Sequence, residues 1–247
     1  MSLSALIPTG LHRDAWLSKQ LRLDCHHIAV DGLDSDEEAF RAYLSTPSRP
    51  RRFIDAKVPV SAVATAQRLE SLGFRIVETR LEFDKLLLKS TTEISGVRFA
   101  RDDERAAIER IAADCVVYSR FHLDPSIDPA AAARVKAQWA GNFFVGKRGD
   151  HMVVAEFEGS ATGFLQLIAG AEKTLIIDLI AVTPPVRGRG LASAMIRFAG
   201  RELAGFERVF VGTQASNAPS VRLYEKLGFC LCESQYVLHF HGPESLS

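Results

Sequence analysis

The sequence has no excess of either charge. Its 30 Lys and Arg residues balance 30 Asp and Glu residues, which gives a formal net charge of zero at pH 7. Proteins that bind nucleic acid or anionic membranes through their overall field carry a basic excess. We therefore expect neither nucleic acid nor a membrane as a partner.

Cysteine is scarce as well. The four cysteines, Cys25, Cys115, Cys230 and Cys232, form no Cys-x-x-Cys pair. Structural zinc sites use such pairs at regular spacings. The pattern therefore favours buried free thiols and predicts no metal site.

Long apolar runs are missing too. The most apolar stretch, residues 174–182, is interrupted by Asp178 and is far shorter than the roughly 20 residues that span a bilayer. The start of the chain has no basic cluster followed by an apolar core and a cleavage site. We expect a cytoplasmic protein without a transmembrane segment.

The remaining composition, 47% hydrophobic and 24% charged, is that of an ordinary globular protein. Its 247 residues suffice for one large core or two modest ones. The polar stretch 89–96 separates two segments with regular hydrophobic patterns, and we place a boundary near residue 94. The prediction is a smaller, non-catalytic α/β domain over 1–94 and a second domain over 95–247.

The second segment alternates between helical and strand patterns. Caps, apolar periodicity and turn residues set the approximate bounds. The expected order is strand (97–100), helix (102–118), helix (128–144), strands (152–157, 163–168 and 175–182), helix (191–203), strand (208–212), helix (217–227) and strand (231–240).

A short internal repeat links the two segments. Arg68-Leu69-Glu70-Ser71-Leu72-Gly73-Phe74 is similar to Leu223-Tyr224-Glu225-Lys226-Leu227-Gly228-Phe229, with a strand pattern on each side of both. The match predicts a strand-helix-strand unit used twice, although chance similarity is the alternative. Leu69 stands at the position of Tyr224.

A glycine-containing loop lies between an expected strand and an expected helix, at Arg187-Gly188-Arg189-Gly190-Leu191-Ala192. Glycines let backbone N–H groups approach a ligand, and a helix start adds unpaired donors and partial positive charge. The loop therefore suits a diphosphate. A plain turn with solvated arginines is the alternative, because the Rossmann and Walker signatures are both missing.

Three motifs in order resemble the GCN5-related N-acetyltransferases: residues 178–182, then Arg187-x-x-Gly190-x-Ala192, then residues 217–229. The resemblance covers residues 95–240. It implies an α/β fold with a central, mostly antiparallel mixed sheet flanked by helices. It also implies acetyl-coenzyme A as cosubstrate and a primary amine as acceptor.

The resemblance assigns residues to the cofactor. In that family the loop amides hold the pyrophosphate, the preceding strand binds the pantetheine, and an Asn and a Tyr on the next helix face the cofactor. The residues implied are Leu179, Ile180, Ala181, Val182, Arg187, Gly188, Arg189, Gly190, Leu191, Ala192, Asn217 and Tyr224.

Direct attack of the amine on the thioester needs no covalent enzyme intermediate, because proximity supplies much of the rate. A thiol has a pKa of about 8.5 and a tyrosine of about 10, so Tyr224 is the expected acid. A core aromatic is the alternative for Tyr224. Asp178, in an apolar strand, is the expected base, because burial raises the pKa of a carboxyl group. Orientation of the neighbouring loop is the alternative for Asp178.

A narrower resemblance concerns the acceptor. Residues 118–124 and Ala137-Gln138-Trp139 are similar to the dTDP-fucosamine N-acetyltransferases, which acetylate the 4-amino group of dTDP-4-amino-4,6-dideoxygalactose. This implies that Arg120, Phe121 and His122 bind substrate, with Arg120 pairing with a nucleotide diphosphate. Other amines (an amino acid, a polyamine, a peptide N-terminus or an aminoglycoside), a non-catalytic acyl-coenzyme A sensor and a homodimer stay open.

Overall fold

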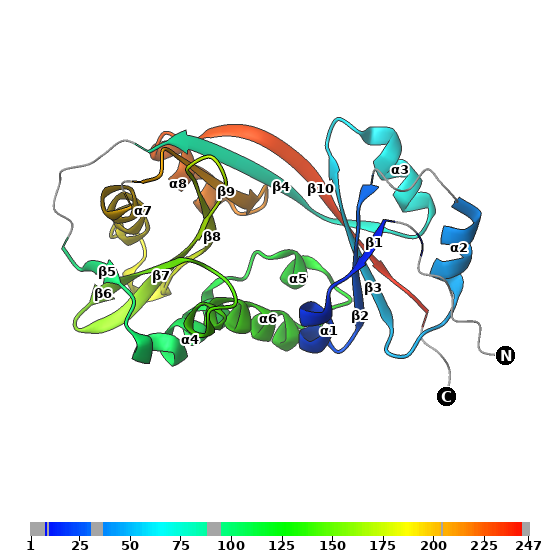
Figure 1. Ribbon diagram of the computed structural model, residues 1–247, viewed down its shortest axis with the longest axis horizontal. Helices are drawn as coiled ribbons and strands as arrows, with labels where there is room; N and C mark the ends of the chain where they lie inside the picture. Colours follow the sequence, from blue (N-terminus) through cyan, green and yellow to red (C-terminus); the bar gives the residue numbers. More distant parts are fainter. Residues whose placement is uncertain (1–7, 9, 31–36, 88–94, 204, 244–247) are drawn as a thin grey trace.

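The computed structural model describes residues 8, 10–30, 37–87, 95–203 and 205–243. Within these ranges ten strands form one sheet, in the order β1-β2-β3-β10-β4-β9-β8-β7-β6-β5 (Figure 1). The pairs β2–β3 and β8–β9 are parallel, and the other neighbouring pairs are antiparallel. The predicted mixed, mostly antiparallel sheet is confirmed.

The elements have the following bounds. The strands are β1 (Leu11–Arg13), β2 (Asp24–Ile28), β3 (Arg52–Pro59), β4 (Arg75–Leu86), β5 (Val97–Phe99), β6 (His151–Phe157), β7 (Ser160–Ala169), β8 (Thr174–Val182), β9 (Arg208–Gln214) and β10 (Cys230–His241). The helices are α1 (Ala15–Leu21), α2 (Glu37–Ser45), α3 (Val63–Ser71), α4 (Arg105–Cys115), α5 (Arg120–Leu123), α6 (Pro129–Gly141), α7 (Leu191–Glu202) and α8 (Ala218–Lys226).

The element order expected for the second segment is confirmed, with the short helix α5 added between α4 and α6. The start of α6 follows from local chemistry, because the Asp128 side chain accepts a hydrogen bond from the Ala130 N–H (3.1 Å) and Pro129 occupies the first turn. The helices expected over 102–118 and 128–144 were predicted too long, because α4 ends at Cys115 and α6 at Gly141.

Helices cover both faces of the sheet (Figure 1). In the C-terminal half, α7 and α8 pack on one face, while α4 and α6 pack on the other. In the N-terminal half, α2 and α3 cover one face, and α1, α5 and α6 cover the opposite one. Helix α6 therefore spans both halves, and α5 lies beside it below the long strands β4 and β10.

The predicted repeat is confirmed by the strand pairing. The units β3-α3-β4 and β9-α8-β10 have equivalent residues 155 positions apart. Arg75 of β4 pairs with His239 of β10, and the equivalent pair is Cys230 with Asp84. The two units are thus related by an approximate two-fold axis between β4 and β10.

The turn after each repeated helix has the same geometry. Gly73 and Gly228 have φ values of +96° and +79°, a region that favours glycine. The N–H of the following phenylalanine donates to the carbonyl of Leu69 in one unit (3.1 Å) and of Tyr224 in the other (3.0 Å). Leu69 therefore occupies the tyrosine position, so the N-terminal unit has no hydroxyl there.

The predicted domain boundary near residue 94 lies in 88–94, outside the described residues, so the division stays a prediction. The sheet itself continues from one half to the other. Strand β10 lies between β3 and β4, and β4 also pairs with β9. The last strand of the chain is therefore built into the N-terminal half.

The prediction of buried thiols is correct for one cysteine only. Cys25 is buried and Cys115 is half-buried, but Cys230 and Cys232 are exposed. The prediction is wrong for this last pair because the first four residues of β10 are all exposed to solvent. Separately, no helix in the described ranges is long and apolar enough to cross a membrane.

Candidate functional site

Two parallel strands separate near the centre of the sheet. Strand β8 pairs with β9 only as far as Ile177, which lies opposite Val211. At the same point the pairing of β8 with β7 shifts by one residue, which makes Asp178 the extra residue of a β-bulge. Beyond it, the edge of β8 that faces β9 has no strand partner among the described residues, so its backbone, apart from the Val182 carbonyl that accepts from Arg187, is available to an extended ligand.

The loop after β8 leads directly into α7. Gly188 and Gly190 have φ values of +78° and +80°, and a Cβ added at either would meet no atom within 4 Å. Gly190 is the N-cap and supplies no side-chain cap. The N–H groups of residues 191–193 make no hydrogen bond to a described residue. This open helix start suits an anionic group.

The two arginines of the loop each have a local contact. Arg187 Nε donates to the Val182 carbonyl (2.9 Å), and the Arg189 guanidinium lies over the Phe157 ring (4.6 Å to its centroid). Both side chains are exposed. They add positive charge at the rim of the loop while the glycine amides stay uncovered.

Helix α8 carries the predicted asparagine and tyrosine. Asn217 is the N-cap, and its side chain accepts from Ser220 N (3.4 Å) and donates to Thr213 Oγ1 (3.2 Å). Tyr224 is 2% exposed and packs against Phe83. Burial raises the pKa of Tyr224 well above its usual range, against the effect of a hydrogen bond with Ser220. The phenol is therefore a weaker acid than an ordinary tyrosine, and its pKa mismatch with a thiol is larger than the sequence suggested.

The Asp178 carboxylate has a full set of donors. It forms a two-pronged ion pair with Arg148 (2.6 and 2.7 Å), and it accepts from Trp139 Nε1 (2.8 Å) and Gln166 Nε2 (3.1 Å). A carboxylate held in this way is not free to take a proton from an amine. The geometry favours the orienting role that the sequence left open.

We predict that Asp178→Asn lowers kcat/KM about tenfold by loosening Arg148 and Trp139, as expected for a supporting residue. The acid limb of the pH–rate profile should keep its position. Loss of that limb in the variant would instead identify Asp178 as the base.

The Ser-Arg-Phe segment forms the start of α5. Arg120 Nη1 donates to Asp55 Oδ2 (2.6 Å), and His122 Nδ1 lies 2.7 Å from Ser119 Oγ. Burial, and then the charge of a nearby lysine, lowers the pKa of His122. Phe121 is 1% exposed in the core between α5, α6 and the sheet. The polar residues Arg120 and His122 therefore flank the buried hydrophobic side chain of Phe121.

Two buried charged residues in this region were not predicted. Glu78 on β4 and Lys136 on α6 are each 8% exposed, and Glu78 Oε2 has no hydrogen-bond partner among the described residues. Burial raises the pKa of Glu78 and lowers that of Lys136 to about 8, and the charge of each opposes the other's shift.

The sequence carried a signal for one of them. Lys136 stands between Ala132 and Ala140 on the apolar stripe of α6, where a charge is unusual. Glu78 gave no such signal, because its burial results from β10 and α5, which are distant in sequence.

Two histidines on β10 share a carboxylate nearby. His239 Nδ1 and His241 Nε2 each lie 2.7 Å from Asp124 Oδ2. Burial opposes ionisation of Asp124, but the hydrogen bonds from His239 and His241 outweigh it and lower its pKa well below the usual range. These atoms are close enough to hold a metal ion, which the sequence did not indicate. Asp124 thus pairs with both histidines, while His239 Nε2 is buried without a hydrogen-bond partner among the described residues.

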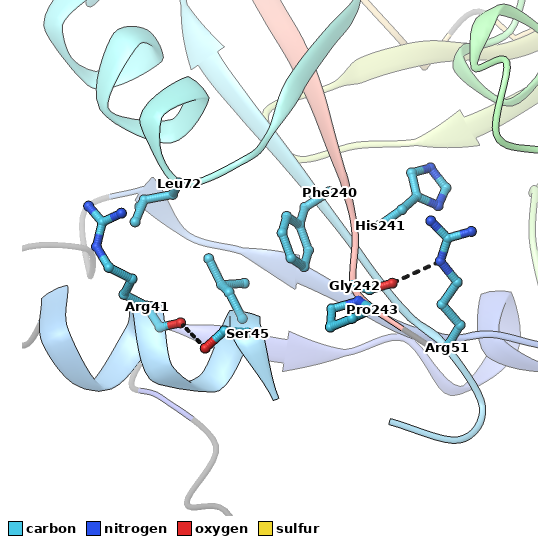
Figure 2. A pocket seen from close by; sticks show the side chains of 9 residues that line it. Arg41, Ser45, Arg51, Leu72, Phe240, His241, Gly242 and Pro243 are labelled. Carbon is cyan, nitrogen blue, oxygen red and sulfur yellow. Dashed lines mark hydrogen bonds between the residues drawn. The ribbon is translucent and has the colours of Figure 1, made fainter. Parts of the chain in front are cut away.

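A separate groove lies where β10 ends. Figure 2 shows Leu72 and Phe240 at its apolar part, with Arg51 Nε donating to the Gly242 carbonyl (2.8 Å). Arg41 lies on its α2 side. No residue predicted to bind cofactor or acceptor lines this groove, so the candidate site remains at the separation of β8 and β9.

The fold is that of the GNAT acetyltransferases. A functionally unknown conserved protein from Staphylococcus epidermidis ATCC 12228 has the same fold, with a TM-score of 0.62, 14% identity and 98% of both chains covered. A GCN5-related N-acetyltransferase from Kribbella flavida gives a TM-score of 0.54, 17% identity, and 90% and 81% coverage of this chain and that chain.

Sequence comparison leads further. Residues 115–229 match the Acetyltransferase (GNAT) family. The chain is also 31% identical over 239 residues to the spore coat polysaccharide biosynthesis protein SpsD of Bacillus subtilis (strain 168), covering 93% of this chain and 82% of that protein. The chain belongs to the GNAT acetyltransferase family and is an N-acetyltransferase. Acetyl-coenzyme A is the acetyl donor of this family.

Proposed function

We propose that the protein transfers acetyl from acetyl-coenzyme A to the 4-amino group of a dTDP-4-amino-4,6-dideoxysugar. The observation that carries this proposal is the buried charged region formed by α5, α6 and β4 beside the bulge at Asp178. In this region Arg120 would bind a diphosphate, and Glu78 would accept the proton of an amine. Similarity to a polysaccharide biosynthesis protein supports a sugar acceptor.

The cofactor occupies the separation of β8 and β9 in this proposal. The amides of 187–192 bind the pyrophosphate at the start of α7, where the N–H groups are unpaired. The backbone of 179–182 binds the pantetheine along the free edge of β8. Asn217 acts through its cap, which fixes the start of α8 beside the cofactor.

Acetyl transfer proceeds by direct attack in a ternary complex. The amine nitrogen attacks the thioester carbonyl, and backbone N–H groups of β8 stabilise the oxyanion. The C–S bond then breaks, and Tyr224 donates a proton to the leaving thiolate. We assign the amine proton to Glu78, because its Oε2 is unpartnered and Asp178 is fully hydrogen-bonded.

Tyr224→Phe should lower kcat by about 10²- to 10⁴-fold, the usual contribution of a general acid. Coenzyme A affinity should change little, because the ring and its packing against Phe83 are retained. Steady-state kinetics and calorimetry measure the two effects. Tyr43→Phe, a buried tyrosine of the N-terminal core, is the matched control. Unchanged turnover of Tyr224→Phe at saturating substrates would remove its role as acid.

A thiol-release assay with a panel of amines tests the acceptor. We expect turnover with the dTDP-4-amino sugar and at least about 100-fold lower kcat/KM with amino acids, polyamines, peptides and aminoglycosides, a discrimination typical of sites with paired polar groups. Turnover of another amine alone would replace the sugar as acceptor. Coenzyme A binding without turnover on any amine would favour the acyl-coenzyme A sensor.

A further inference from the structure

Lys136 is a buried cation that forms no ion pair with a carboxylate of the described residues. Its ammonium makes no hydrogen bond or ion pair with a described residue, and its close contacts are the rings of Trp139 (4.5 Å to the centroid) and Phe121 (5.6 Å). Burying an ammonium group is costly unless its N–H groups find acceptors. The three donors of Lys136 are therefore available to a ligand.

A second cation faces the same space. Arg120 and Lys136 both lie over the Phe121 ring, and after burial the charge of Arg120 is the largest influence that lowers the pKa of Lys136. The Arg120 guanidinium lies 4.8 Å from the centroid of the Phe121 ring and uses Nη1 for Asp55. Its other N–H groups make no hydrogen bond to a described residue.

Lys57 on β3 adds a third cation. It has no hydrogen bond or ion pair with a described residue. Its pKa is lowered by burial, then by Arg80, and then by Arg120. Lys57 lies two residues after Asp55 on β3, so its side chain is on the same face of the sheet as the Asp55–Arg120 ion pair.

The neighbouring carboxylates do not neutralise this group. Asp55 is paired with Arg120, and Asp178 is paired with Arg148. Glu78 is the remaining acid near Lys136, and burial raises its pKa. The region therefore holds more positive than negative charge. The cations repel one another when no ligand is bound, and an anionic ligand relieves this repulsion.

We propose that Lys136, Arg120 and Lys57 bind a phosphate group of the acceptor. In this proposal Lys136 sets the preference for phosphorylated acceptors over amines that carry no phosphate. A phosphate accepts several N–H donors at once and carries enough charge to offset the repulsion between the cations. Lys136 contacts Trp139, which hydrogen-bonds Asp178 at the β8 bulge. The phosphate would thus bind beside the reacting amine. The assignment of this phosphate to the acceptor rests on the proposed function.

Binding of thymidine diphosphate and of inorganic diphosphate to the full chain tests the site without catalysis. Calorimetry in the presence of coenzyme A should show Lys136→Met raising both dissociation constants about 10- to 100-fold, the worth of a charge-assisted hydrogen bond. Lys136→Arg should keep most of the affinity, and the exposed Lys226→Met should leave it unchanged. Failure of the wild type to bind either probe would overturn the proposal.

Kinetics separate this inference from the proposed function. The ratio of kcat/KM for the sugar nucleotide to that for the free amino sugar should fall at least about tenfold in Lys136→Met. An unchanged ratio would overturn the role of Lys136 even if the sugar nucleotide is the substrate. Conversely, Lys136-dependent diphosphate binding without acetylation of any sugar nucleotide would retain the phosphate site and reject the acceptor. Lys136→Gln guards against a folding defect of the methionine variant, with thermal unfolding as the check.

Discussion

Gly190→Leu is expected to abolish coenzyme A binding, with a dissociation constant raised at least about 100-fold, or 2.7 kcal/mol. Gly190 has φ +80°, and its Cβ direction meets no protein atom within 4 Å. A side chain there would project into the space at the start of α7 that we assign to the pyrophosphate. It would also disfavour the backbone conformation that presents the amides of α7. Calorimetry with coenzyme A measures the loss.

Gly159→Leu is the matched control for this variant. Gly159 has φ +74° in the turn between β6 and β7, and a Cβ there also meets no atom within 4 Å. The substitution carries a similar backbone cost, about 1–2 kcal/mol for a left-handed residue, but lies outside the loop. Affinity should be unchanged. Retained affinity in Gly190→Leu, or equal loss in both variants, would contradict the loop assignment.

Glu78→Gln is expected to lower kcat about 100-fold or more, the scale of a general base. The amide keeps the volume and polarity of the side chain but cannot take the amine proton. Because Glu78 must be ionised to act, activity should rise with pH through its raised pKa, and this acid limb should disappear in the variant. Glu82→Gln on the same strand, whose partner is Arg80, is the control. A Glu78→Gln profile with an intact acid limb would reject the base.

The alkaline limb of the same profile reports on Lys136. Burial lowers its pKa to about 8, and the groups that face it are Arg120, Asp178, Glu78 and Arg148. The cationic form binds phosphate, so kcat/KM for the sugar nucleotide should fall above about pH 8. This limb should be absent for the free amino sugar, which carries no phosphate. An identical alkaline limb for both acceptors would assign it to another group.

Local features of the fold were predictable from the sequence. The loop Gly188–Gly190, the Asn217 cap and the repeated Leu-Gly-Phe turn depend on backbone conformations that a few consecutive residues specify. The order of strands and helices followed for the same reason, because apolar periodicity and caps act over short distances. These features also carried the resemblance to the family.

The partners of Asp178 and the position of Glu78 depend on the tertiary structure. The Asp178 carboxylate accepts hydrogen bonds from Trp139 and Arg148, which are 39 and 30 residues away in sequence. These contacts favour an orienting role for Asp178 over that of a base. Glu78, the base in our proposal, lies on β4, which pairs with β10 on one side and with β9 on the other.

The sequence by itself thus determined the family, the glycine-containing loop before α7 and the duplicated strand-helix-strand unit. Only the tertiary structure decided which charged groups are buried and which are paired, because burial and partners arise from segments distant in the chain. Lys136 illustrates the difference. Its place on the apolar stripe of α6 is visible in the sequence, but its position over the Phe121 ring, which it shares with Arg120, is not.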